Sequence, residues 1–509
     1  MIISLSVLVI TIIVSGTYAL YKAQLSKNIG VNTTTHGLAY YINYVKGTDI
    51  TAATLNPSTS YEGGASSDIE FWKKDDSYDI YGKIELTVNT IGTNLSNSPA
   101  LKYAVVNNGN VLKEGSLKGT TSGSKVTILK NLYLEQTKQI YTVYVWLDNS
   151  EELGNISNES LSISVDCTAS LQKEPTAADT IISLYTSAAK VTATNNSITY
   201  NTAPSVSLMN DRLGGTTTDL DGGNIRYYGA NPNNYIYFNC SDYSNQTSST
   251  CEVWRIIGVF DGKLKLIKSE SIGAYSWDNK DTSTGAESDT GKNDWTTARL
   301  MKLLNPSDYY VVDSNDNELG QSLYWNSASG KCYSGFQNAI VDCDFTSTGI
   351  KNDTTRNMIA EVIWNLGGSD TNKVYSNQMY EYERGTTVYT GRPTIWTGKI
   401  ALAYLSDYGY AVDLNECKDK ALYDYDSIPC ELYNWIKAIL GTDGFEWLLA
   451  VTYNDATGVG FVRSSGVPYN NGPAAGEQKV VPVLYLSSEL GIESGAGDGS
   501  SSNPYKLSI

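Results

Sequence analysis

The chain has 509 residues, more than one ordinary domain holds, and its length suggests roughly two to four domains. Its 54 acidic and 37 basic residues give a net charge of −17, which disfavours binding to nucleic acid or to anionic lipid headgroups. The single histidine, His36, excludes a histidine general base or a multi-histidine zinc site unless another chain supplies the residues.

Uncharged polar residues dominate the rest of the composition. Charged residues make up only 18% of the chain, so the polar surface must consist largely of Ser, Thr, Asn and the 38 tyrosines. Tyr, Thr and Val suit a half-exposed pleated sheet better than a surface helix. We therefore predict a mainly β protein.

The first 21 residues, Met1–Tyr21, carry no charge and are long enough to cross a hydrocarbon core of about 30 Å as a helix. The first charge is Lys22, and no basic residue precedes the apolar stretch as it does in a secretory signal. Thr17 and Ala19 are spaced as in a signal-peptidase site. Residues 1–27 are thus predicted to be a hydrophobic N-terminal helix. Three fates of this helix are open: it packs with its own copies in an assembly, it anchors the chain in a membrane, or it is cleaved as a signal peptide. All three indicate that the protein is exported.

Residues 28–167 contain short strand-like runs separated by Asn, Gly and Ser clusters, which is typical of a β-sandwich. In the run Tyr141 to Trp146, the alternation lets one face fill a core, with Tyr141, Val143 and Val145 on one side and Thr142, Tyr144 and Trp146 on the other. Residues 168–200 include the clearest helical pattern, which we interpret as a helical linker between two domains.

Residues 201–509 hold eight of the ten tryptophans and mix strand-like and helical pieces, so an α+β domain is predicted. The runs VWRIIGVF and KLKLIKSE meet at Asp261-Gly262, a good hairpin turn, while NDWTTARLMKLLN and ELYNWIKAIL have the pattern of short amphipathic helices.

Six of the seven cysteines form sequence-local couples in turn-rich sequence, which predicts hairpin disulfides and an oxidising, extracellular location. The spacing does not fit a zinc knuckle. Cys167 is left over and is expected to be a buried free thiol. The predicted pairs are Cys240 with Cys251, Cys332 with Cys343, and Cys417 with Cys430.

The string SGTYALYKAQ, followed by a sandwich that closes with YTVYVWLDNSEELGNISNESLSISV, resembles the TasA/camelysin group of extracellular matrix proteins over residues 1–167. This resemblance implies a fibre subunit that lends a strand to its neighbour, with residues 20–37 as the donor segment. An uncleaved N-terminal helix would instead resemble type IV pilin-like proteins, although Leu5 stands where common bacterial pilins have glutamate.

The strings NIRYYGANPNNYIYFN, CEVWRIIGVF and VVPVLYLSSEL resemble a domain of unknown function that recurs in surface proteins of Firmicutes. The resemblance covers about 280 residues, and its late WLL-type motif, here Trp447 to Leu449, is similar to C-type-lectin-like folds. Val481 departs from this family, which generally has arginine before the proline.

No catalytic, cofactor-binding or metal-binding residue is predicted. The acidic run Asp313 to Glu318 offers alternating oxygen donors, but it lacks the glycine and the later bidentate glutamate of a calcium loop, so a solvated turn is the simpler interpretation.

The sequence thus predicts a bacterial extracellular filament subunit at the cell surface that is not an enzyme. It would associate with itself through the N-terminal segment, meet a membrane before assembly, and display an adhesive C-terminal domain to a surface glycan or protein. The alternatives are a membrane-anchored lectin-like adhesin that does not polymerise and a secreted glycan-active enzyme.

Overall fold

The computed structural model divides the chain into two compact units, Met1–Glu174 (unit 1) and Pro175–Ile509 (unit 2). Each unit is described separately. The described residues are 23–25, 41–52, 55–151, 153–156, 158–212, 223–279, 290–310, 319–336, 339–440 and 445–508. Strands dominate both units, and the prediction of a mainly β protein is confirmed.

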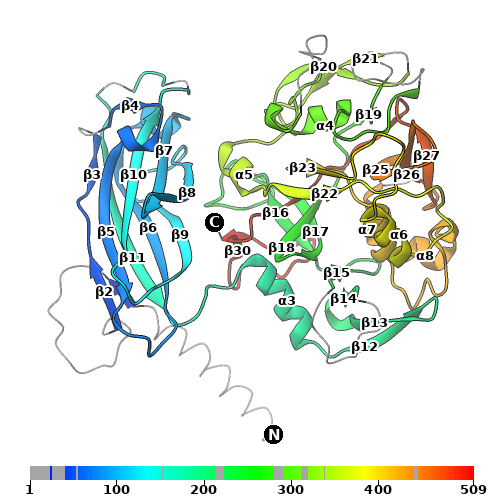
Figure 1. Ribbon diagram of the computed structural model, residues 1–509, viewed down its shortest axis with the longest axis horizontal. Coiled ribbons are helices and arrows are strands. Elements are labelled where there is room, and N and C mark those ends of the chain that lie inside the picture. Colours follow the sequence, from blue (N-terminus) through cyan, green and yellow to red (C-terminus); the bar gives the residue numbers. More distant parts are fainter. Residues whose placement is uncertain are drawn as a thin grey trace, which may run out of the picture. The chain divides into compact units, whose positions relative to one another are not determined.

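Unit 1 is a sandwich of two sheets that lie face to face (Figure 1). One sheet has the order β1 (Ala23–Leu25), β11 (Leu161–Ser170), β6 (Tyr81–Ile91) and β9 (Lys125–Tyr133), with β3 (Ile50–Thr51) also on β11. The other has the order β2 (Ile42–Val45), β5 (Ala65–Lys73), β10 (Ile140–Asp148), β7 (Leu101–Asn107) and β8 (Asn110–Ser116), with β4 (Pro57–Ser58) on β10. The short helix α2 (Thr93–Asn97) follows β6.

The core of unit 1 comes from alternating side chains of the two sheets. Tyr141, Val143 and Val145, which were predicted to share one face, are all buried in it. Trp146, expected on the opposite face, is buried as well and lies beside the ring of Tyr61.

The main sheet of unit 2 contains strands from both ends of the unit. Its order is β12 (Val191–Asn195), β13 (Ile198–Ala203), β14 (Leu208–Asn210), β15 (Ile225–Tyr227), β17 (Glu252–Phe260), β18 (Lys263–Lys268), β29 (Val483–Tyr485) and β24 (Ile400–Ala401), with β16 (Tyr235–Phe238) also on β17. As predicted, β17 and β18 form a hairpin, because Asp261 and Gly262 both take the positive φ values, 47° and 70°, that its tight turn requires.

A second sheet of unit 2 has the order β19 (Ala274–Ser276), β28 (Glu477–Lys479), β25 (Phe445–Val451), β26 (Gly458–Arg463) and β27 (Pro468–Pro473). Three separate strand pairs join β20 (Ser329–Tyr333) to β21 (Ile340–Asp344), β22 (Val362–Asn365) to β23 (Ile395–Gly398), and β30 (Gly491–Ile492) to β31 (Leu507–Ser508). The helices are α3 (Ala177–Ser187), α4 (Arg299–Leu304), α5 (Asp353–Met358), α6 (Ser376–Glu383), α7 (Leu405–Tyr410), α8 (Ile428–Leu432) and α9 (Trp435–Leu440).

The structure corrects the predicted helical linker at 168–200. The helix α3 begins after Thr176, which forms a capping box with Asp179, and it buries Ile181 and Tyr185 in the core of unit 2. Residues 191–203 continue into β12 and β13 of the main sheet. The sequence predicted one domain at 28–167 and another at 201–509, with a linker between them. In the structure a single boundary after Glu174 separates the two units, because α3 and the strands that follow it have their apolar partners in unit 2.

The predicted hydrophobic helix at 1–27 lies outside the described residues, except that residues 23–25 form β1. The segment that contains His36 and the acidic run Asp313 to Glu318 also lie outside the described residues. Within the part of the chain that the structure describes, none of the helices has the length and apolar character needed to cross a membrane.

Candidate functional site

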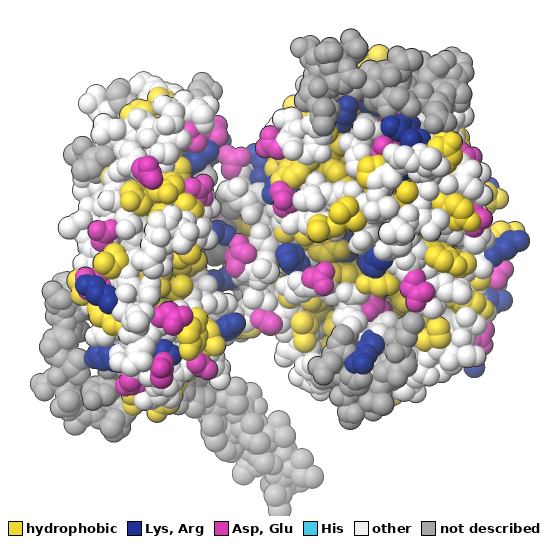
Figure 2. All heavy atoms as spheres, viewed as in Figure 1, with side chains coloured by type: hydrophobic (Ala, Val, Ile, Leu, Met, Phe, Trp, Pro, Cys, Tyr) yellow, Lys and Arg dark blue, Asp and Glu magenta, His cyan; other side chains and the backbone are white. Residues whose placement is uncertain are grey.

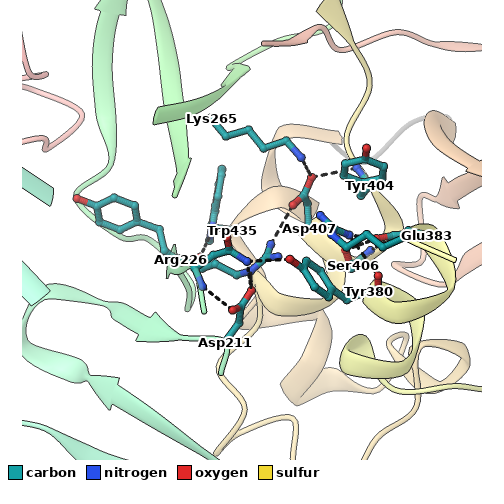
Figure 3. A network of polar contacts seen from close by, with 12 residues as sticks. Asp211, Arg226, Lys265, Tyr380, Glu383, Tyr404, Ser406, Asp407 and Trp435 are labelled. Atoms are coloured by element: carbon teal, nitrogen blue, oxygen red, sulfur yellow. Dashed lines mark hydrogen bonds and ion pairs between the residues drawn. The ribbon is translucent and has the colours of Figure 1, made fainter. Parts of the chain in front are cut away.

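A cluster of charged side chains, most of them buried, lies in the interior of unit 2 (Figure 3). It joins elements that are distant in sequence: β14 and β15, the strand β18, the end of α6, and α7. Its charged members are Asp211, Arg226, Lys265, Glu383, Arg384 and Asp407. We call this group the buried charge cluster.

Asp407 is the centre of the buried charge cluster. Its Oδ1 lies 2.9 Å from Nη1 of Arg226, and its Oδ2 contacts Nζ of Lys265. The side chains of Asp407 and Lys265 are both 0% exposed, and that of Arg226 is 1% exposed. The first turn of α7 orients the carboxylate, because the backbone N–H of Tyr404 donates to Oδ2 at 3.0 Å.

Two further carboxylates complete the cluster. Oδ2 of Asp211 lies 2.6 Å from Nε of Arg226 and also accepts a hydrogen bond of 2.8 Å from the side-chain amide of Asn224. Glu383 accepts a hydrogen bond of 2.8 Å from the N–H of Ser406 and lies 3.3 Å from Nη1 of Arg384. Three cations therefore face three anions, so the buried charge is balanced.

Aromatic rings enclose the cations of the cluster. Nζ of Lys265 lies 4.3 Å from the ring centre of Tyr404, with the rings of Phe260, Tyr485 and Trp364 at 5.2, 5.4 and 5.5 Å. The guanidinium of Arg226 lies 4.6 Å from the ring centre of Phe260. These rings exclude water and attract the cations through their electron-rich faces.

Burial and neighbouring charges set the protonation of this cluster. Burial lowers the pKa of Lys265 to about 8 against the opposing effect of Asp407, and the nearby Arg226 lowers it further. Burial opposes ionisation of Asp407, but Lys265 and Arg226 hold its pKa below the ordinary value. Burial raises the pKa of Glu383. Below a pH of about 8, Lys265 and Asp407 therefore face each other as an ion pair unless they react with one another.

The side chains of Asp407, Lys265 and Arg226 are closed to solvent, so a diffusing substrate has no direct approach to them, while the side chain of Arg384 is 23% exposed. None of the residues of the buried charge cluster was singled out in the sequence, where they are scattered from position 211 to position 407.

All three predicted disulfides are present, and each closes a loop of unit 2. They join Cys240 to Cys251, Cys332 to Cys343, and Cys417 to Cys430. Cys167 is a buried free thiol in the core of unit 1, and burial raises its pKa well above the ordinary value. Among the described residues, no group of three or more His, Cys, Asp or Glu side chains is arranged to hold a metal ion.

The surface offers a second kind of candidate site. Figure 2 shows charged side chains scattered over the visible face of each unit, with wide uncharged areas between them. In unit 2, Ile428 and Leu432 of α8 are 71% and 64% exposed, and Tyr423 and Tyr433 are also exposed. We call residues 422–433 the apolar surface segment, after these four exposed side chains. The Cys417–Cys430 disulfide anchors this segment to the rest of unit 2. Exposed aliphatic and aromatic side chains on a braced segment are typical of a contact surface for a partner.

Asp278 lies shortly after β19 and is fully buried. Among the described residues, it forms no salt bridge, and its Oδ1 has no hydrogen-bond partner. Burial raises its pKa to about 7, although Arg299 acts in the opposite direction. In the unfolded chain its pKa is about 3.9. Between these values the folded state binds more protons than the unfolded state, so the free energy of unfolding falls as the pH rises from about 4 to about 7.

We therefore expect Asp278→Asn, which stays neutral, to be more stable than the wild type by on the order of 2–4 kcal/mol at pH 8, with no gain at pH 4. Urea unfolding at a series of pH values measures this difference. The exposed residue Asp308 provides a control, because a substitution at the surface such as Asp308→Asn should leave stability almost unchanged. A difference between Asp278→Asn and the wild type that is constant from pH 4 to pH 8 would contradict the assignment.

No family model matches the chain, and no curated protein matches it. Among solved structures, a mutant of the protein designated HCR/D is 11% identical with a TM-score of 0.15, over 50% of this chain and 75% of that chain. The receptor-binding domain of botulinum neurotoxin mosaic serotype C/D is 10% identical with a TM-score of 0.14, over 50% of this chain and 74% of that chain. Likeness at this level carries no argument about the fold or function of this chain.

Proposed function

We propose that the chain is a structural subunit of a bacterial extracellular filament and that unit 2 is its displayed adhesive part. The three disulfides support an extracellular or secreted location, because such bonds form and persist in oxidising compartments. The buried charge cluster fits this role, since it braces the interior of unit 2 and offers no access to a substrate.

The observation that carries the proposal is the pairing of β1. This strand begins one residue after the uncharged segment 1–21 and lies at the edge of a sandwich sheet, antiparallel to β11, with Ala23 opposite Ala169 and Leu25 opposite Cys167. A strand at a sheet edge can be supplied by the same chain or by a neighbouring copy, because the hydrogen bonds to the sheet are the same. In a filament, the apolar segments of several copies would pack together. In each copy, β1 would then connect this packed segment to the sandwich.

Sedimentation and electron microscopy of the purified full-length chain test the proposal. Elongated assemblies that pellet and contain intact Met1 are expected. Uniform single particles that retain Met1 would overturn the filament role.

The apolar surface segment favours a second candidate, a membrane-anchored adhesin that does not polymerise. A glycan array probed with the full-length chain in detergent addresses it, with Ile428→Ser/Leu432→Ser as the matched variant. Binding by monomers that the double substitution abolishes would favour this candidate over the filament.

A further inference from the structure

We propose that Lys265 and Asp407 become joined by an intramolecular amide bond between Nζ and Cγ, formed with loss of one water molecule after unit 2 has folded. The bond would tie β18 of the main sheet to α7, across 142 positions of the chain. This inference concerns the buried charge cluster alone and does not depend on the filament role.

The first support is proximity without water. Nζ of Lys265 contacts Oδ2 of Asp407, and neither side chain has any exposure to solvent. Two reacting groups held at contact by a folded scaffold behave as if they were at very high concentration, which removes most of the entropic barrier to bond formation. Water, which would hydrolyse or compete, is excluded by the rings of Tyr404, Phe260 and Trp364.

The second support is activation of the amine. A lysine becomes a nucleophile when it is desolvated in an apolar site or placed beside other cations. Lys265 meets both conditions, because it is fully buried and because the guanidiniums of Arg226 and Arg384 act on it.

The third support is the arrangement of donors around the carboxyl group. Nη1 of Arg226 lies 2.9 Å from Oδ1 of Asp407, where negative charge develops during attack on Cγ, and a fixed cation at that position stabilises the tetrahedral intermediate. The N–H of Tyr404 donates to the other oxygen, Oδ2, and holds the carboxyl group in place.

The atoms balance without any co-reactant. One proton passes from the Lys265 ammonium to Oδ2, leaving a neutral amine and a neutral acid. The lone pair of Nζ then attacks Cγ, and Oδ1 carries the resulting negative charge opposite Arg226. A second proton moves from Nζ to Oδ2, the bond between Cγ and Oδ2 breaks, and Oδ2 leaves as water. The product is a secondary amide, and no group is oxidised or reduced.

The charge balance of the cluster favours the product. Amide formation removes one buried cation and one buried anion together, and it leaves Arg226 with Asp211 and Arg384 with Glu383. No charge is left without a partner, and the desolvation cost of one buried ion pair disappears. Oδ1 of Asp407, now an amide oxygen, keeps its contact with Arg226.

Peptide mapping of the purified full-length chain by mass spectrometry tests the proposal. After reduction and complete trypsin digestion, an unlinked chain yields the separate peptides 266–268 and 400–418. Trypsin does not cleave after an acylated lysine, so the linked chain yields peptide 264–268 joined to peptide 400–418. The mass of the joined species equals the sum of the masses of peptides 264–268 and 400–418 less one water molecule. Recovery of the two unlinked peptides in full amount, without the joined species, would overturn the proposal.

Two controls show whether the loss of one water molecule comes from the bond between Lys265 and Asp407. Lys331 and Asp342 are also in contact but are exposed, and they should remain unlinked in the same digest. Lys265→Arg keeps the charge and removes the primary amine, so its digest should lack the joined species. A joined species in Lys265→Arg would contradict the assignment, and if that variant does not fold, the map of the wild type decides alone.

Discussion

Asp407→Ala is expected to destabilise unit 2 by at least about 3–5 kcal/mol, because it leaves the charges of Lys265 and Arg226 buried with too few anions and also prevents the proposed amide bond between Lys265 and Asp407. Urea unfolding followed by tryptophan fluorescence measures the change, since unit 2 holds eight of the ten tryptophans. The exposed pair of Lys331 and Asp342 provides the matched control, and Asp342→Ala should leave stability almost unchanged.

A second substitution separates charge imbalance from simple loss of packing. Adding Lys265→Met to Asp407→Ala removes the extra cation and leaves Arg226 with Asp211. The double variant should therefore be more stable than Asp407→Ala alone, as expected for residues that belong to one ionic network, and neither variant can form the proposed amide bond. If the double variant were no more stable than Asp407→Ala, the ionic account of the cluster would be wrong.

A charge placed in the N-terminal apolar segment is expected to abolish assembly. A buried, unpaired carboxylate is strongly unfavourable, so Val9→Asp should release the chain from any assembly held by packing of residues 1–22. The variant should leave the pelleted fraction and sediment as single particles, while Val9→Leu should assemble as the wild type does. Equal assembly of Val9→Asp and the wild type would show that this segment does not hold the subunits together.

Local patterns predicted the parts of the fold that depend on near neighbours in sequence. The turn at Asp261 and Gly262 requires positive φ values, and the cysteine couples are close in sequence, so both are visible in the chain itself. The helical pattern of α3 was also recognised. Its place in unit 2 could not be predicted in the same way, because the strands against which α3 packs, β15, β17, β18 and β30, come from later parts of the chain.

The buried charge cluster could not be predicted by the same patterns. In the run KLKLIK, alternation predicts that Lys265 faces solvent, but both faces of β18 are covered in the folded unit. The sequence does contain one usable signal: two of these charged residues stand alone in apolar and aromatic runs. Arg226 lies between Ile225 and Tyr227, and Asp407 lies within ALAYLSDYGYAV. Charged residues in such surroundings are seldom buried without a partner.

An image reconstruction of the purified full-length chain by cryo-electron microscopy tests the central claim most directly. The account predicts filaments in which residues 1–22 of successive copies pack together along the axis, with unit 2 on the outside. Preparations that contain only separate particles, or a mature chain that begins at Leu20, would contradict it.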